Sequence, residues 1–206
     1  MTRSDKFIAI HVVAGAVLLC AGLLGTDRVI AEALRSSGQE AIGLFISGTV
    51  FLDTATGKEV SKFLVGFVLM GLGAVLLFLA RTRNAGRNLL FVGLVQFCAT
   101  LVAGVTKNAF GRLRPFQVLE NGDWAHAWFV GGNSFPSGHT AFYFGLFMPL
   151  AYLFPRWRWP LMLVPWFIAV ARVDANDHFL SDVAVSIVLS GTLTWVFATW
   201  LSRRQD

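Results

Sequence analysis

Six long apolar runs constrain this chain more than any other feature of its sequence. A helix needs about 20 apolar residues to cross the hydrocarbon layer of a membrane, where it satisfies its own backbone hydrogen bonds. Hydrophobic residues make up 55% of the 206-residue chain, more than a soluble domain needs. We therefore expect an all-α fold, a polytopic membrane helix bundle with six transmembrane helices in a single integral-membrane domain, 1–206. The runs are 7–25, 62–80, 88–106, 139–154, 160–173 and 183–201.

The segment between the first two runs, 26–61, has a different pattern. From Asp27 to Arg35, charged side chains are interleaved with apolar ones such as Ile30, and the apolar stretch 45–52 is too short to span a membrane. This pattern predicts short amphipathic helices that lie along the membrane surface. Such helices would act either as a lid or substrate guide or, more plainly, as a packed connector.

The charges between the runs predict the orientation of the bundle. With the N-terminus inside, the inner segments hold nine basic and two acidic residues, a net +7, whereas the outer segments hold eight basic and ten acidic residues, a net −2. Basic residues favour the cytoplasmic side of a membrane. We therefore expect a bacterial inner-membrane protein with both termini in the cytoplasm. The basic residues form no long stripe, so no nucleic-acid partner is expected.

Three short motifs lie beside apolar runs, and the six-span arrangement places all of them at the outer, periplasmic face. The first is Lys-x6-Arg-Pro, from Lys107 to Pro115; the second is Pro-Ser-Gly-His, which ends at His139; the third is Arg-x5-His-x3-Asp, from Arg172 to Asp182. Together and in this order they resemble the signature of the type 2 phosphatidic acid phosphatase family, the membrane lipid phosphate phosphatases. The layout of apolar runs extends the resemblance to most of the chain.

Two departures from the family pattern bear on substrate preference more than on chemistry. Ala171 stands where many members have Ser before the Arg of the third motif. The stretch 174–177 is acidic, where the family commonly has an apolar spacer that contains Gly.

Lys107, Arg114 and Arg172 are the candidates for binding a substrate phosphate. Phosphoryl transfer depends mostly on positioning and on stabilising charge on the phosphoryl oxygens, and the planar fork of Arg can bind two oxygens at once. Ser137 and Gly138 would open a helix whose first amide groups can face an anion. Ser137 would add a hydroxyl donor, and Gly138 would let the backbone come close.

His178 and His139 are the candidates for the chemistry itself. On a helix, His178 and Asp182 would share one face because they are four residues apart. The carboxylate would then hold the imidazole tautomer that can attack phosphorus and form a covalent intermediate. His139 has no such partner nearby in the sequence, and it could protonate the leaving alkoxide and later activate water. The family resemblance implies the same assignment.

The other charged residues near the motifs receive no catalytic role. We assign Arg112 to contacts with lipid headgroups. Asp174, Asp177, Glu120 and Asp123 are interpreted as solvated loop positions, because acids that faced the site would repel a phosphate. Cys, His and carboxylate residues show no spacing typical of metal ligands, so we expect neither a metal nor a cofactor.

Three functions fit this sequence. The first is a phosphatase that hydrolyses a phosphomonoester or diphosphate of a membrane lipid through a phosphohistidine; the second is a phosphotransferase with the same intermediate; the third is a non-enzymatic six-helix protein that binds or transports lipids. The candidate lipids are phosphatidic acid, phosphatidylglycerol phosphate, undecaprenyl diphosphate and lipid A. The pair Phe179-Leu180 after His178 looks like the lipid A branch of the family. The sequence leaves the choice of lipid and the oligomeric state open.

Overall fold

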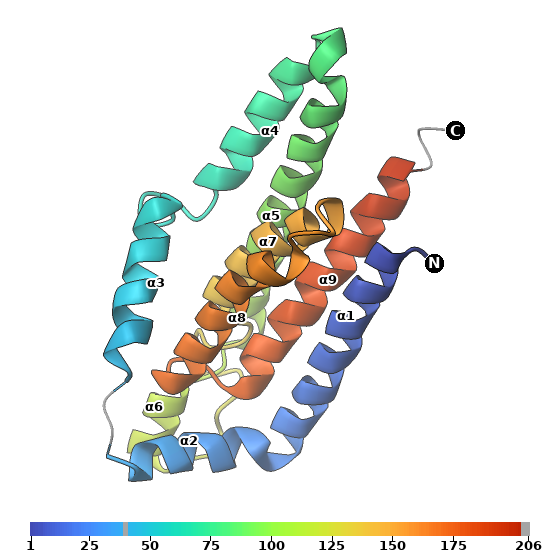
Figure 1. The fold of residues 1–206 in the computed structure, drawn as a ribbon. Coiled ribbons are helices and arrows are strands. Elements are labelled where there is room, and N and C mark those ends of the chain that lie inside the picture. Colours follow the sequence, from blue (N-terminus) through green and yellow to red (C-terminus); the bar gives the residue numbers. More distant parts are fainter. Residues whose placement is uncertain (39–40, 203–206) are drawn as a thin grey trace.

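The computed structural model describes residues 1–38 and 41–202, and every regular element in these residues is a helix (Figure 1). All six apolar runs coincide with helices, namely α1, α4, α5, α7, α8 and α9, so the prediction of an all-α fold is confirmed. The α-helices are α1 (Arg3–Ala21), α2 (Asp27–Ser36), α3 (Gly43–Ala55), α4 (Leu64–Leu77), α5 (Arg83–Phe110), α6 (Pro115–Asn121), α7 (Gly138–Leu153), α8 (Arg158–Asp174) and α9 (Leu180–Ser202).

Three continuous helical segments of the described chain are long and apolar enough to cross a membrane by length and composition: Arg3–Ser36, Ala80–Asn121 and Leu180–Trp200. The other helices in the apolar runs are shorter. α4 has 14 residues, α7 has 16 and α8 has 17, below the roughly 20 that a perpendicular span requires. A bundle with six transmembrane helices therefore stays a prediction.

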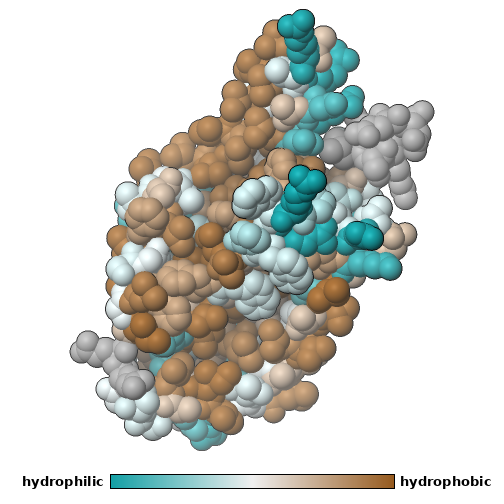
Figure 2. All heavy atoms as spheres, in the orientation of Figure 1, coloured by the Kyte–Doolittle hydropathy of each residue, from teal (hydrophilic) through white to brown (hydrophobic). Residues whose placement is uncertain are grey.

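Apolar side chains cover the outside of several helices. Val17 on α1, Val75 on α4 and Leu163 on α8 are 62%, 60% and 70% exposed. Figure 2 shows this surface as a broad brown area over α4, with hydrophilic residues gathered where α4 meets α5 and over the α7–α8 connection. Contiguous apolar surface of this extent is unfavourable in water and suits contact with hydrocarbon.

The central helix of the bundle is α7, around which α5, α8 and α9 pack. Its successive residues Phe142, Tyr143 and Phe144 are fully buried. Gly145 permits the close approach of α5, since a Cβ atom there would lie 2.9 Å from the Cβ of Ala99. Because α7 is enclosed on all sides, the Pro-Ser-Gly-His motif at its start has a rigid support.

The two helices of the segment 26–61 take different directions. Gly25, in the π-helical turn Gly22–Thr26, has φ 131°, a conformation that favours glycine, and from there α2 lies across one end of the bundle (Figure 1). This agrees with the expected surface helix. In contrast, α3 runs alongside α8 (Figure 1). α3 therefore differs from the predicted amphipathic surface helix. Its side chains are mostly apolar; some pack against α8 and the others face outward.

The predicted orientation in the membrane rests partly on residues that the structure does not describe. Arg203, Arg204 and Asp206 contribute to the inner charge count and Glu40 to the outer one, and all four lie outside the described residues. The starts of α7 and α9 are joined at one end of the bundle by a hydrogen bond from the backbone N–H of Ser137 to the carbonyl oxygen of Asp182, at 2.9 Å. The second and third motifs therefore meet there, as a single site requires.

Candidate active site

His178 and Asp182 form a buried pair at the start of α9. The ring Nδ1 of His178 lies 3.6 Å from Oδ2 of Asp182, and the two side chains are 2% and 0% exposed. The contact does not arise as predicted from two residues on one helix face, because His178 precedes the first residue of α9. It arises at the helix start, where Asp182 in the first turn accepts the backbone N–H of Phe179 at 2.8 Å and the hydroxyl of Ser134 at 2.5 Å.

Burial keeps the His178 ring neutral. Removal from water disfavours the imidazolium form and lowers the pKa of His178 to about 4, although the interaction of the ring with the Asp182 carboxylate acts in the opposite direction. Asp182 and Ser134 both lie at Nδ1, so Nε2 is the ring nitrogen left to act on a substrate. A neutral imidazole with one nitrogen held by a carboxylate is the form that can act as a nucleophile.

Arg112 is part of this buried group, which corrects the assignment to lipid headgroups. Its guanidinium donates to Oδ1 of Asp182 at 2.6 Å, to Oδ2 of Asp27 at 2.8 Å and to the hydroxyl of Ser181 at 2.7 Å. The Arg112 side chain is 6% exposed, so it cannot reach the headgroup region. Asp27 is equally buried and does not belong to a solvated helix face, because its carboxylate is needed to balance the charge of Arg112.

Two aromatic rings enclose the Arg112 guanidinium. Its central carbon lies 4.3 Å from the ring centroid of Trp128 and 3.9 Å from that of Phe179. Aromatic faces attract a cation and exclude water from it. The sequence pattern missed this role because no motif marks Arg112, Asp27 or Trp128. The only signal was an Arg two residues before the motif Arg.

Arg114 and Arg172 meet at a shared carboxylate. Arg114 Nη1 lies 2.8 Å from Oδ1 of Asp177, and Arg172 Nη2 lies 2.6 Å from Oδ2 of the same residue. Asp177 is therefore not a solvated loop position, since its carboxylate pairs with two cations at once. This arrangement holds the two guanidinium groups at the same carboxylate.

Asn133 holds two of the cationic side chains that are predicted to bind phosphate, Arg114 and Lys107. Arg114 Nε donates to Oδ1 of Asn133 at 2.9 Å, and the Lys107 ammonium donates to the backbone carbonyl of Asn133. Arg172 Nε is buried and has no hydrogen-bond partner in the described part of the chain. An unpaired buried donor is costly, and a phosphoryl oxygen at this position would satisfy it.

Ser137 caps the start of α7, as the sequence predicts for the Pro-Ser-Gly-His motif. Its hydroxyl accepts the backbone N–H of Thr140 at 3.4 Å and the hydroxyl of Thr140 at 2.9 Å. Gly138 lies against Lys107, whose Cε would be 3.5 Å from a Cβ at that position. Ser137 is fully buried and its backbone N–H is bonded to Asp182, so only its hydroxyl hydrogen is left for a ligand.

His139 has a carboxylate partner that its sequence neighbourhood does not contain. Its Nε2 lies 2.9 Å from Oδ2 of Asp53, 86 residues earlier in the chain. Asp53 also accepts from Lys58 Nζ at 2.8 Å and from the Tyr143 hydroxyl at 2.7 Å. The expectation that the sequence neighbourhood of His139 holds no such partner is met, and the fold supplies one from a distant segment. A faint signal existed, because Asp53 is an acid directly after the apolar stretch 45–52.

The remaining acids near the motifs have peripheral positions. Glu120 and Asp123 are exposed, as expected. Asp174 accepts the backbone N–H of Ile42 at 2.8 Å, so it ties the segment before α3 to the end of α8. Among residues 1–38 and 41–202, no three His, Cys, Asp or Glu residues form a group that could hold a metal ion. Independence of metals and cofactors stays a prediction.

Residues 88–206 match the model of the PAP2 superfamily. The chain belongs to the PAP2 superfamily. This match covers more than half of the chain and contains all three motifs, so the resemblance to type 2 phosphatidic acid phosphatases is confirmed. The catalytic and phosphate-binding roles of the individual residues stay predictions.

Two curated PAP2-like relatives cover almost the whole chain. Lipid A 1-phosphatase of Rhizobium etli is 28% identical over 96% of this chain and 84% of the relative. Lipid A 1-phosphatase of Rhizobium johnstonii is 25% identical over 95% of this chain and 76% of the relative. A third, the bacitracin transport permease protein BcrC of Bacillus licheniformis, is 24% identical over 70% of this chain and 74% of the relative. No solved structure matches.

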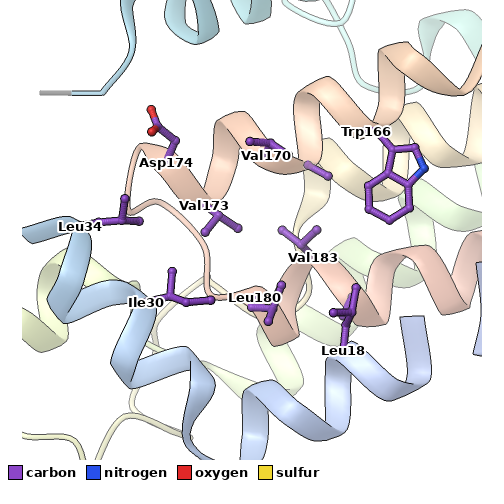
Figure 3. A pocket seen from close by; sticks show the side chains of 11 residues that line it. Leu18, Ile30, Leu34, Trp166, Val170, Val173, Asp174, Leu180 and Val183 are labelled. Carbon is purple, nitrogen blue, oxygen red and sulfur yellow. The ribbon is translucent and has the colours of Figure 1, made fainter. Parts of the chain in front are cut away.

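The apolar helices and these relatives identify this PAP2 member as an integral membrane protein. An apolar cavity of about 270 Å³ lies between α8 and the helices α1, α2 and α9. Figure 3 shows Ile30, Val173 and Leu180 lining it, with Asp174 at its edge. Leu180 follows His178 by two residues in the chain, but the lining of the cavity includes none of the predicted catalytic or phosphate-binding residues. An apolar cavity in this position suits a hydrocarbon chain.

Proposed function

We propose that this protein is a lipid phosphate phosphatase that works through a phosphohistidine on His178. The single observation that carries the proposal is a neutral, carboxylate-held imidazole next to a pair of Arg side chains, one of which has a buried donor without a partner. A phosphate placed against Arg114 and Arg172 would satisfy that donor and would lie near His178, whose backbone N–H donates to the carbonyl of Arg172 at 3.1 Å.

The reaction proceeds in two steps. Nε2 of His178 attacks phosphorus, the bond from phosphorus to the lipid oxygen breaks, and His139 gives its proton to the leaving oxygen. In the second step His139 takes a proton from water, whose oxygen attacks the phosphohistidine and releases inorganic phosphate. Lys107, Arg114 and Arg172 stabilise the charge on the phosphoryl oxygens in both steps. These roles need no metal ion.

Lipid A is the substrate that we favour. The two relatives that cover almost the whole chain are both named lipid A 1-phosphatase, and the apolar cavity between α8 and the helices α1, α2 and α9 suits an acyl chain. The test is a phosphate-release assay with the detergent-solubilised protein over four lipids: lipid A, phosphatidic acid, phosphatidylglycerol phosphate and undecaprenyl diphosphate. We expect release from lipid A to be fastest, and no release by His178→Ala. Equal rates on all four would contradict the preference for lipid A.

Two other functions are tested by the same preparation. A phosphotransferase would move labelled phosphate to a lipid acceptor and release little of it free. A transport function has one observation in its favour, the name of the Bacillus licheniformis relative. Lipid movement across vesicles that survives in His178→Ala, without phosphate release by the unmodified protein, would support transport and overturn the phosphatase.

We further propose that the site faces the periplasm and that both termini are cytoplasmic. The charge difference between the two sets of connecting segments supports this orientation. In a variant without native cysteines, a cysteine probe at Asn121 should react with an impermeant reagent from outside, and a probe at Ala85 should not. The reverse labelling pattern would place the site on the cytoplasmic side.

A further inference from the structure

A second histidine–carboxylate pair lies outside the three motifs. Asp53 comes from the last turn of α3 and contacts His139 at the start of α7. Its Oδ2 is 2.9 Å from Nε2 of His139 and 2.8 Å from Nζ of Lys58, and its Oδ1 accepts the hydroxyl of Tyr143 at 2.7 Å. Both oxygens of the carboxylate are thus held in defined directions.

This carboxylate stays charged although it is largely shielded from water. The side chains of Asp53 and Lys58 are 13% and 12% exposed, and that of His139 is 26% exposed. The ammonium of Lys58 compensates the negative charge, so the carboxylate can act on His139 as an anion. Asp53 is also close enough to Arg172 to interact with its charge. The pair therefore lies within electrostatic range of Arg172, a predicted phosphate ligand.

We propose that Asp53 is a positioning residue for His139. A carboxylate at Nε2 keeps a proton on that nitrogen, so Nδ1 becomes the nitrogen that exchanges a proton with the substrate. Burial and the positive charges of Lys58 and Arg172 disfavour the doubly protonated ring of His139, and the Asp53 carboxylate acts against them by stabilising that form, which a general acid needs. This inference rests on the proposed phosphatase function, and it extends the site to a segment, 26–61, that contains none of the three motifs.

The proton balance of this arrangement is simple. In the first step Nδ1–H of the charged His139 goes to the leaving lipid oxygen, while the hydrogen on Nε2 stays in its bond to Asp53. In the second step Nδ1 takes a proton from the attacking water, and His139 is charged again. Asp53 neither gains nor loses a proton in the cycle, and for that reason we assign it a positioning role.

The alternative is that Asp53 only fastens α3 to α7. The two roles differ in how they depend on the leaving group. A lipid oxygen needs a proton in order to leave, whereas the phenolate of an activated aryl phosphate leaves without help. Loss of a positioning residue for the acid should therefore slow the first step on a lipid much more than on an aryl phosphate. Loss of a mere structural contact should affect both substrates equally.

The experiment compares Asp53→Asn with the unmodified protein and with Glu59→Gln. The control removes an acid from the same connection, where Glu59 accepts the hydroxyl of Thr54 in an exposed pair. For Asp53→Asn we expect kcat on the lipid phosphate to fall about 10²-fold, while the burst with 4-nitrophenyl phosphate stays within about threefold. Glu59→Gln should match the unmodified protein on both substrates.

A double variant and a second single variant complete the test. Asp53→Asn combined with His139→Ala should be no slower on the lipid than His139→Ala alone, because Asp53 acts through His139. Tyr143→Phe removes one anchor of Asp53 and should give a smaller change in the same direction. It also keeps the inference testable if Asp53→Asn does not fold. Equal losses on both substrates, or additive losses in the double variant, would overturn the positioning role.

The failure of the inference can be separated from a failure of the proposed function. If the unmodified protein forms no phosphohistidine with either substrate, the phosphatase proposal fails. In that case ¹⁵N-histidine spectra still decide the pairing, because Asp53 should hold the hydrogen of His139 on Nε2 and Asp53→Asn should shift that resonance. An unchanged His139 resonance in Asp53→Asn would overturn the positioning role independently of activity.

Discussion

The two histidine–carboxylate pairs of this protein are built in opposite ways. His178 and Asp182 are four residues apart and almost fully buried, and their surroundings include the enclosed Arg112. His139 and Asp53 are 86 residues apart, are partly exposed, and depend on a helix, α3, that runs beside α8 and contacts α7 through Asp53. The difference matches the two predicted tasks. A nucleophile must be held rigidly and kept neutral, whereas an acid that later activates water must be reached by the leaving group and by water.

Replacement of each histidine by alanine should give the largest loss of activity and should distinguish the two pairs most clearly. His178→Ala removes the covalent step, so we expect a loss of roughly 10⁴-fold or more on every substrate and no labelled protein. His139→Ala should be comparably impaired on a lipid phosphate. With an activated aryl phosphate it should show a burst and accumulate phosphohistidine, because the first step needs no acid but the second needs a base.

The two alanine variants are compared in a rapid-mix time course. It measures labelled phosphate bound to the protein in an acid-labile, base-stable form, as expected of phosphohistidine. The unmodified protein serves as the reference for burst size. Label on His178→Ala would mean that another residue is the nucleophile. A His139→Ala protein that is inactive on both substrates and traps no label would contradict the role of His139 as acid and base.

The cations beside the two carboxylates, Arg112 at Asp182 and Lys58 at Asp53, should differ in their contribution to the free energy of unfolding. Arg112→Gln leaves Asp27 and Asp182 buried without their cation, which should lower the free energy of unfolding by about 3–5 kcal/mol. Lys58→Gln leaves Asp53 with its bonds to His139 and Tyr143, and should cost only about 1 kcal/mol. The comparison uses unfolding in detergent followed by tryptophan fluorescence. Arg112→Lys is the control, since it keeps the charge but loses the fork. Equal losses of unfolding free energy in Arg112→Gln and Lys58→Gln would mean that the two cations contribute equally to stability, contrary to this prediction.

Arg172 lies between the pairs, so a change there should affect both substrates alike. Arg172→Lys keeps the charge but loses the planar fork and the buried Nε donor. We expect kcat/KM to fall roughly 10²-fold, or about 3 kcal/mol of transition-state stabilisation, on lipid and aryl phosphates equally. Steady-state kinetics on the two substrates checks this. A variant within about twofold of the unmodified protein would mean that Arg172 is peripheral.

The pH dependence of phosphohistidine formation should give the smallest effect. The pKa of His178 is lowered by burial from 6.5 to about 4, so the ring stays neutral and nucleophilic down to about pH 5. The burst rate with a saturating aryl phosphate should therefore change by only about twofold between pH 7 and pH 5. A tenfold fall centred near pH 6.5 would mean that His178 has the pKa of a solvated histidine.

The same shift predicts a stability change with a definite sign. Between about pH 4 and pH 6.5 the unfolded chain binds a proton at His178 that the folded protein does not bind. The contribution of His178 to stability is thus fully present above pH 6.5 and is lost as the pH falls towards 4. The midpoint of thermal unfolding of the unmodified protein, relative to that of His178→Ala, should fall over this interval.

The sequence by itself determined the features that depend on local spacing. All six apolar runs are helices, because runs of this length have no other way to satisfy their backbone in lipid. Ser137 caps α7 where the Pro-Ser-Gly-His motif predicts a helix start. The pairing of His178 with Asp182 was expected from a separation of four residues on one helix, but His178 precedes α9 and the contact forms at the helix start.

Only the tertiary structure decided which distant charges meet. Arg112 and Asp27 are 85 residues apart, and Asp53 and His139 are 86 residues apart, so no periodicity relates them. Their contacts depend on how α2 crosses the end of the bundle and how α3 runs beside α8, which side-chain packing determines. Asp177 lies within the third motif, directly before His178, but it pairs with Arg114 from the first motif. A charge that is buried at low dielectric needs a partner, and the partner available is set by the fold.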